Sequence, residues 1–183
     1  MKTKYLLRAA LCLALIAVGA RIQIPLPYFD YYTFQFTFVL LTAVLLPPIY
    51  AIGTMVTYIA MGLLGIPVFA GGGGFDYVLR PSFGYLIGFL ATVVVLAQIY
   101  KRKQPTTKWG YFLLNTIGIV VTYLFGLTYK TAILHFYLGQ AVPIWAILTT
   151  AFAFDIPADV IMVFCLSLIE VRVVKAIGAS NLG

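Results

Sequence analysis

The sequence predicts an all-α integral membrane protein that forms a single domain over residues 1–183. Hydrophobic residues make up 63% of the chain, charged residues only 9%, and the mean hydropathy is +1.04, which is far from the values of soluble domains. Long apolar runs alternate with short connections that contain proline or polar residues. Because one membrane span needs about 20 apolar residues, the chain has room for about six spans and for no separate soluble domain. We therefore expect six transmembrane helices.

The expected spans can be placed one after another along the chain. Prolines mark three boundaries, since Pro25 follows the first span, Pro47 and Pro48 form a turn after the second, and Pro81 suits the first turn of the fourth. The six spans are expected at about residues 5–24, 34–46, 49–64, 81–100, 109–127 and 155–172.

The stretch 128–154 is less regular, and the sequence leaves its structure open. It contains an apolar run, 141–154, that is either a further short helix or an extension of one of its neighbours. A seventh span here would move the carboxyl terminus to the other face of the membrane. Lys130, near the start of the stretch, is interpreted together with Arg21 as an anchor at the membrane interface.

The net charge of +7 indicates orientation in a membrane rather than affinity for nucleic acid. Basic residues in short loops mark the cytoplasmic side of a membrane protein. With six spans, the amino terminus, the turn at Pro47 and Pro48, the 101–108 loop and the carboxyl terminus lie on one face, and basic residues dominate three of these four elements. We therefore expect both termini in the cytoplasm and the glycine-rich stretch on the outer face.

Residues 62–88 interrupt the apolar pattern with four consecutive glycines, 71–74, and with the charged side chain of Arg80. Irregular backbone near membrane depth is tolerated where it lines a cavity, and charges beside it indicate a functional site. The glycines are not a phosphate loop, because no Gly-Lys-Ser or Gly-Lys-Thr follows them. We expect Gly72 and Gly73 to let the backbone approach a ligand closely, although a plain flexible connector fits the composition equally well.

Two carboxylates open the last span. Asp155 and Asp159 are four residues apart, so they share one face of a helix. Stabilisation of the helix amino terminus, worth about 0.3–1 kcal/mol, is enough to explain Asp155. Asp159 lies deeper in apolar surroundings and needs a cation or hydrogen-bond donors. Arg80 is the predicted partner, either of Asp159 or of a ligand; the alternative is that Arg80 reaches the lipid headgroups.

Two further surfaces are predicted to make contacts, one with a ligand and one with a partner protein. In the aromatic loop after the first span, Tyr28, Phe29 and Tyr31 are expected to cover a flat apolar ligand as a lid. On the first span, Ala10 and Ala14 form a face of small residues that lets another helix approach closely. This face suits the docking of a partner, and packing against the chain's own helices is the equally weighted alternative.

Three segments of the sequence occur in a characteristic order. They read RIQIPLPYFDYYTFQ after the first span, GLLGIPVFAGGGGFDYVLRPSFGYLIGF in the glycine-rich stretch, and FDIPADVI at the start of the last span. With these segments the chain resembles the BioY proteins, the biotin-specific substrate-binding (S) components of energy-coupling-factor (ECF) vitamin transporters. The resemblance covers nearly the whole chain, and the middle segment is the most specific of the three.

The resemblance implies a six-helix S component of the bacterial plasma membrane that binds biotin from outside and has no cofactor of its own. Uptake in that family requires a module of two ATPases and a transmembrane coupling protein, which consumes the ATP. An alanine face on the first helix docks S components to this module, and it maps to Ala10 and Ala14. Combined with the residue patterns above, the expected substrate-binding residues are Arg80, Asp159, Tyr85, Gly72, Gly73 and Asp155.

The chain departs from the family pattern at two positions. Arg80 stands where the family usually has asparagine, and Met162 stands where it usually has a lysine three residues after the aspartate. A cation is thus lost from one helix and gained on another, so Arg80 is expected to replace the lysine's charge opposite Asp159. Biotin remains the favoured ligand. A related acid without a ureido ring, such as lipoate, is the alternative if the lost donors have retuned the pocket, because a site built for a ureido rejects ligands that lack one.

Two other classes of function compete with transport. An intramembrane enzyme would use Asp155 and Asp159 as acid and base or as metal ligands. No third carboxylate or histidine is clearly placed with them, and His135 is the only histidine. We therefore expect neither enzymatic activity nor a metal site. A purely structural membrane subunit would bind no small molecule and would tolerate changes at Arg80 and Asp159.

Overall fold

A computed structural model of the chain describes residues 2–25, 31–139 and 142–178. Its elements, in chain order, are α1 (Lys2–Arg21), β1 (Gln23–Pro25), β2 (Tyr31–Thr33), α2 (Gln35–Leu45), α3 (Pro48–Leu63), the 3₁₀ helix η1 (Phe75–Leu79), α4 (Phe83–Lys103), α5 (Lys108–Ala132), the π-helical turn η2 (Ile133–Tyr137), α6 (Ile144–Thr150), the π-helical turn η3 (Ala151–Asp155) and α7 (Ile156–Ile177).

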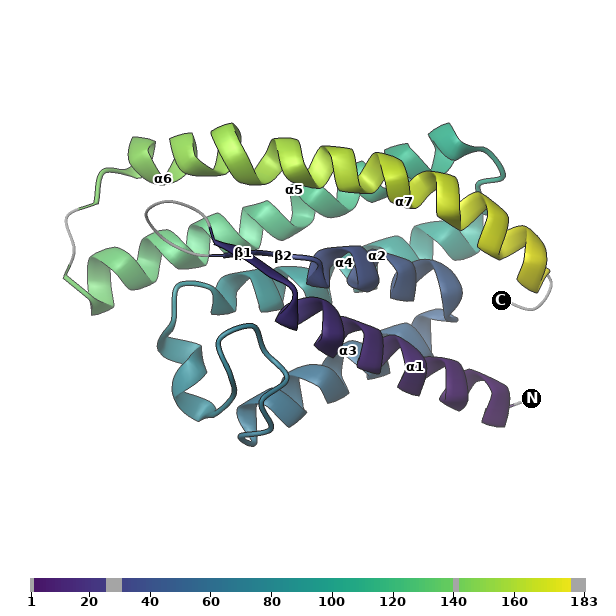
Figure 1. Cartoon of the computed structure of the whole chain (residues 1–183), viewed down its shortest axis with the longest axis horizontal. Helices are drawn as coiled ribbons and strands as arrows, with labels where there is room; N and C mark the ends of the chain where they lie inside the picture. The colour runs from purple at the N-terminus through teal and green to yellow at the C-terminus, as the bar shows by residue number, and fades with distance from the viewer. Residues whose placement is uncertain (1, 26–30, 140–141, 179–183) are drawn as a thin grey trace.

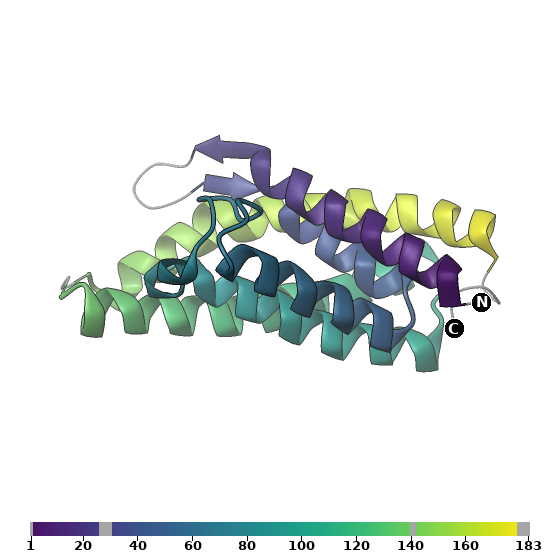
Figure 2. The same ribbon diagram turned by 90° about the horizontal axis from the view of Figure 1, so that it is seen from below.

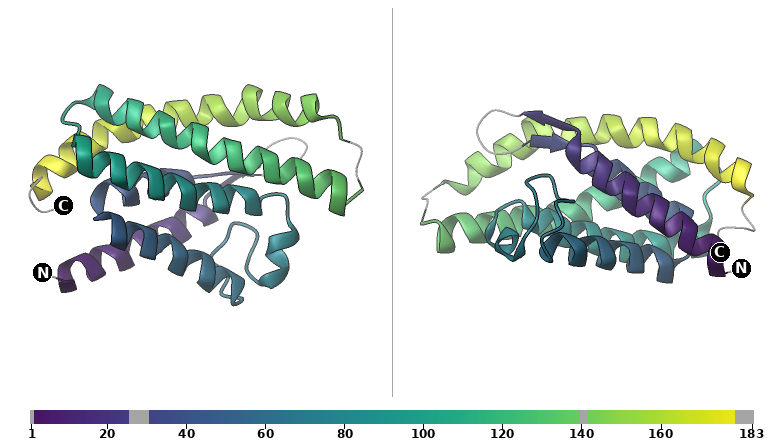
Figure 3. Two further views of the ribbon diagram at one scale, coloured as in Figure 1. Left: turned by 180° about the vertical axis from the view of Figure 1, so that it is seen from behind. Right: turned by 60° about the horizontal axis from the view of Figure 1, so that its bottom comes forward.

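The long helices pack in a bundle, and the connections alternate between its two ends (Figure 1). One end, which we call the terminal end, carries the start of α1, the end of α7 and the α2–α3 and α4–α5 turns (Figure 3). The opposite end, the hairpin end, carries strands β1 and β2, the segment between α3 and α4, the end of η2 and the start of α6 (Figure 2). Lys101, Arg102 and Lys103 form the last turn of α4, at the terminal end. These basic residues, on which the predicted orientation depends, therefore lie at one end of the bundle.

The expected fold class is confirmed in the described part of the chain. Three helical segments are long and apolar enough to cross a membrane by length and composition: Thr3–Arg21, Phe83–Lys103 and Lys108–Tyr137. Helices α2 and α3 are apolar but shorter. Pro48 occupies the first turn of α3, and the Thr107 side chain accepts a hydrogen bond from the Gly110 backbone N–H at the start of α5.

The stretch that the sequence left open extends both of its neighbours. Helix α5 continues through η2 to Tyr137, and α6 and η3 lead without a break into α7. The last two spans are therefore longer than expected, and the apolar run before Asp155 belongs to the last helix. The wide turn of η3 lies directly before Pro157, which cannot donate a backbone hydrogen bond to the preceding turn. The helix accommodates this proline instead of ending at it.

Strands β1 and β2 form a two-stranded antiparallel hairpin that was not anticipated from the sequence. Ile24 pairs with Tyr32, and the flanking pairs set a register with no bulge. Polar side chains at the base of the hairpin hold the glycine-rich segment, since Arg21 donates to the Pro67 carbonyl and Gln23 donates to the Ala70 carbonyl. The first helix and the glycine-rich segment are thereby fixed to each other at the hairpin end.

Helices α4 and α5 approach each other closely because glycines line their contact. A Cβ atom at Gly88 would lie 2.7 Å from the Thr122 carbonyl oxygen, and one at Gly84 would lie 2.3 Å from the Tyr129 Cβ. In the same helix contact, the hydroxyls of Thr92 on α4 and Thr122 on α5 are 2.8 Å apart and buried. Small residues and hydroxyl pairs are the usual means of packing helices in lipid. This contact sets the position of the α5 side chains that face the hairpin end.

Candidate ligand-binding site

A cavity of about 120 Å³ lies at the hairpin end, where β2 meets the bundle helices. It is lined by Tyr32, Thr33, Gln35, Phe36, Ala70, Tyr77, Ser82, Tyr85, Leu86, Phe89, Thr122, Tyr123, Lys130, Asp155 and Asp159. Its apolar wall includes Phe36 and Phe89, whose rings are stacked with centroids 5.6 Å apart. Cavities that combine apolar walls with a few placed polar groups are typical ligand sites.

Asp159 is the most firmly held polar group of the cavity. Its side chain is only 5% exposed, and its two oxygens accept different hydroxyls: Oδ1 that of Tyr32 at 2.8 Å and Oδ2 that of Tyr123 at 2.7 Å. Hydrogen bonds to an ionised acceptor are short and strong. Burial raises the pKa of the Tyr32 hydroxyl, and the charge of Asp159 raises it further, so Tyr32 remains a donor. The carboxylate thus connects the hairpin, α5 and α7.

Lys130 supplies a cation to the same cavity. It lies near the carboxyl end of α5, is 6% exposed, and lines the cavity together with Asp155 and Asp159. The interpretation of Lys130 as an interfacial anchor is therefore wrong. It followed from ending the fifth span at residue 127, whereas α5 continues and places Lys130 seven residues, about two helical turns, beyond Tyr123 on the same face.

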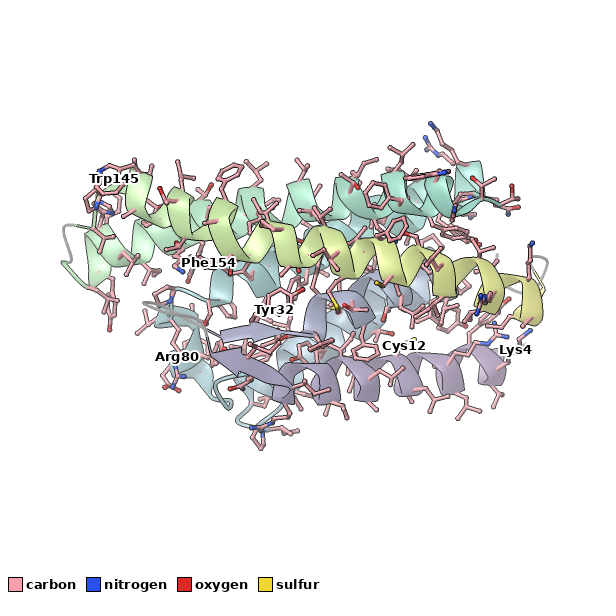
Figure 4. All side chains as sticks on the ribbon, turned by 45° about the horizontal axis from the view of Figure 1, so that its top comes forward. Lys4, Cys12, Tyr32, Arg80, Trp145 and Phe154 are labelled. Carbon is pink, nitrogen blue, oxygen red and sulfur yellow. The ribbon has the colours of Figure 1, made fainter. Side chains whose placement is uncertain are left out.

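Arg80 lies at the edge of the site and not within it. Its side chain is exposed, its guanidinium donates to the Gly71 carbonyl at 3.1 Å, and it stacks over the Tyr77 ring at 5.1 Å. Figure 4 shows Arg80 at the periphery of the molecule, apart from Tyr32. The expected pairing with Asp159 is not formed, because two tyrosine hydroxyls hold that carboxylate. Arg80 instead clamps Tyr77, which is buried and lines the cavity.

The other predicted contact residues divide into two groups. Tyr85 and Asp155 line the cavity, and the Tyr85 ring meets the Tyr123 ring edge to face with centroids 5.8 Å apart. Gly72 and Gly73 are not among the lining residues. Gly72 has φ +112, and a Cβ at Gly73 would lie 2.4 Å from the Ile66 carbonyl oxygen. These glycines are therefore required for a tight turn of the chain against itself.

The described residues include only part of the predicted lid, and they include the predicted docking face on α1. Tyr28 and Phe29 lie outside the described residues, and for Tyr31 the structure gives its backbone pairing with Pro25 in the hairpin. Ala10 and Ala14 are both exposed on α1. Partner docking through this face stays a prediction.

The described residues offer no set of side chains for binding a metal ion. They contain no cluster of three or more histidine, cysteine, aspartate or glutamate side chains that could hold a metal ion. Asp159 has its two tyrosine donors, and its neighbour Asp155 faces the cavity that also contains Lys130. The arrangement is suited to holding a ligand by hydrogen bonds and apolar contact.

Together these features define a small helical membrane protein with a ligand cavity at one end of its bundle. The chain belongs to the BioY family, whose model matches residues 1–179. The resemblance of the three segments is thereby confirmed.

Relatives and a solved structure agree with this assignment. A probable biotin transporter BioY from Lysinibacillus sphaericus is 35% identical over 173 residues, which cover 94% of this chain and 88% of the relative. The biotin transporter BioY of Thermotoga maritima is 34% identical over 135 residues, covering 73% and 76% of the two chains. The crystal structure of the S-component for biotin from an ECF-type ABC transporter matches with a TM-score of 0.76 at 26% identity, over 95% of this chain and 92% of that one.

Proposed function

We propose that this chain is the biotin-binding S component of an ECF-type transporter and is not an enzyme. Its family, its relatives and the matching S-component structure support this assignment. The observation that carries it is the cavity in which Tyr32 and Tyr123 present the buried Asp159 carboxylate beside an apolar aromatic wall. Biotin combines a ureido ring that donates hydrogen bonds, an apolar bicyclic body and one carboxylate, and each part finds a complementary group.

The proposed contacts follow from the charge of each group. Asp159 can only accept hydrogen bonds while it is ionised, so it receives an N–H of the ureido ring. Phe36 and Phe89 cover the apolar body of the ligand. Lys130 is a cation with three donors, which makes it the partner of the ligand carboxylate. Arg80 contributes indirectly, through the position of Tyr77.

Transport requires partners that this chain does not contain. We propose that a module of two ATPases and a transmembrane coupling protein binds the α1 face that includes Ala10 and Ala14, and that its ATP hydrolysis drives release of the ligand inside. No cofactor of the chain itself enters this scheme. The terminal end of the bundle is proposed to face the cytoplasm, because the amino terminus, the α4–α5 loop and the end of α7 carry basic residues, and the cavity at the hairpin end then opens outward.

The direct test is calorimetric titration of the purified protein in detergent with biotin and with lipoate. We expect Asp159→Asn to weaken biotin binding at least tenfold, whereas Asp76→Asn, at an exposed carboxylate of η1 outside the cavity, leaves it unchanged. Arg80→Ala is expected to have a smaller effect than Asp159→Asn. Tighter binding of lipoate would change the substrate and keep the scaffold. Binding of neither ligand would favour a structural subunit.

A further inference from the structure

A second buried carboxylate lies outside the ligand cavity. Glu170 on α7 is 0% exposed, and its Oε2 accepts a hydrogen bond from the Asn115 side-chain nitrogen on α5 at 2.7 Å. Asn115 is fully buried as well. Asp159 and Glu170 are separated by about three turns of α7, so this pair lies further toward the terminal end than the Tyr123–Asp159 contact.

The hydrogen bonding of this pair is incomplete in a particular way. Glu170 Oε1 and Asn115 Oδ1 are the two buried side-chain atoms without a hydrogen-bond partner in the described part of the chain. Both atoms are acceptors, and they belong to two groups that already touch. Exchanging the amide oxygen and nitrogen of Asn115 would not help, because an ionised carboxylate has no hydrogen to give to the amide oxygen.

No cation compensates a charge at this position. Glu170 forms no ion pair with any described residue, and its hydrogen bonds are limited to the one from Asn115. Its electrostatic neighbours are the hydroxyls of Tyr100 on α4 and Tyr111 on α5, which are 3.5 Å apart. Helix α2, which also packs against α7, carries no titratable side chain. An uncompensated buried carboxylate is costly, and such a group takes up a proton instead.

We infer that Glu170 is a proton-binding site, and that one proton closes a reciprocal acid–amide pair with Asn115 that locks α5 to α7. The protonated Oε1 donates to Asn115 Oδ1 while the Asn115 amide donates to Oε2. A single proton therefore satisfies both of the unpartnered acceptors. Loss of that proton leaves two acceptors facing each other, so the α5–α7 contact weakens as the pH rises.

Infrared spectroscopy of the purified, ligand-free protein at neutral pH tests this directly. We expect the difference between wild type and Glu170→Gln to contain the carbonyl stretch of a protonated carboxyl group. Asn115→Ala should move that band to higher frequency, because the amide hydrogen bonds are removed. Ser167→Ala is the matched control: it removes another buried polar group of α7, one that bonds the Val163 carbonyl, and should leave the band in place.

If the difference spectrum shows that Glu170→Gln has lost the stretching bands of an ionised carboxylate and not that of a protonated carboxyl group, Glu170 is ionised in wild type. That result would overturn the inference. The pH dependence of unfolding gives a second readout. The unfolding temperature of wild type should fall relative to that of Glu170→Gln as the pH rises from about 4 to neutral, because over this range the unfolded carboxyl is ionised while the folded one keeps its proton; parallel curves over this range would also overturn it. If Glu170→Gln does not fold, an acid band in wild type that fails to shift in Asn115→Ala decides against the pair.

Discussion

The hydroxyl of Tyr123 on α5 donates to Oδ2 of Asp159 on α7 at 2.7 Å, inside the cavity. These two helices run antiparallel, and the same pair of helices is joined again by Asn115 and Glu170. The first contact faces the ligand cavity, and the second is buried away from it. The Tyr123–Asp159 contact in the cavity and the inferred proton site at Glu170 are thus two contacts of one helix pair, so rotation of α7 against α5 would disturb both.

Removing the Tyr123 hydroxyl should weaken biotin binding without unfolding the protein. Tyr123→Phe keeps the ring that packs against Tyr85 and deletes one donor to Asp159. A hydrogen bond to a charged group is worth about 1.5–3 kcal/mol. This bond is already present without ligand, so only its part in orienting Asp159 enters the affinity, and we expect a loss of roughly three- to tenfold. Calorimetric titration measures the change. Tyr100→Phe removes a buried hydroxyl outside the cavity, and an equal loss in that control would contradict a local effect.

The proposed role of Lys130 predicts a dependence on the ligand's own charge. Lys130→Met should weaken binding of biotin by roughly tenfold or more, as expected for losing a charge-assisted contact of about 1.5–3 kcal/mol. A biotin amide, which has no carboxylate, should bind wild type weakly and should lose little further in the variant. Lys175→Met, at an exposed lysine of α7, is the control. If the acid and the amide lose affinity equally, Lys130 does not contact the carboxylate.

The approximate positions of the spans can be predicted from the sequence, because apolar composition and prolines determine them. The surroundings of a side chain are predicted poorly where a helix continues beyond the end of its regular hydrophobic pattern. Lys130 was assigned to the membrane interface because residues after 127 lost their regular pattern, while hydrogen bonding carries the helix to Tyr137. Tyr32 was missed because its position depends on pairing with Ile24 across residues that carry no strong strand signal.

Asp159 was identified correctly as a buried group in need of donors, since depth in an apolar helix can be read from sequence. The tyrosines that donate to Asp159 could not be identified from the sequence. Arg80 was the nearest cation in the pattern, but the path of the glycine-rich segment directs its guanidinium to the Gly71 carbonyl. The path that an irregular segment takes through the folded protein produces no periodic pattern in the sequence.

The close packing of α4 on α5 predicts that Gly84 tolerates no side chain. Gly84→Ala would place a methyl group 2.3 Å from the Tyr129 Cβ, which must move together with its helix. Overpacking of this kind costs about 1–3 kcal/mol, so the unfolding temperature in detergent should fall. Gly53→Ala, on α3 with nothing within 4 Å of the new methyl group, should instead stabilise by about 0.5–1 kcal/mol. Equal behaviour of the two variants would show that the helices can separate without cost.

Large side chains on the α1 face should separate ligand binding from transport. Ala10→Trp and Ala14→Trp project from an exposed face of α1, away from the residues that line the cavity. Biotin binding by the isolated variants should therefore equal that of wild type. Co-purification with the two ATPases and the coupling protein, and biotin uptake by cells, should both be lost, because a bulky ring prevents close helix approach. Ala60→Trp, at an exposed alanine of α3, controls for the added surface. If the α1 variants retain full uptake, the module docks elsewhere; if they lose biotin binding as well, α1 acts on the cavity and not on the partner.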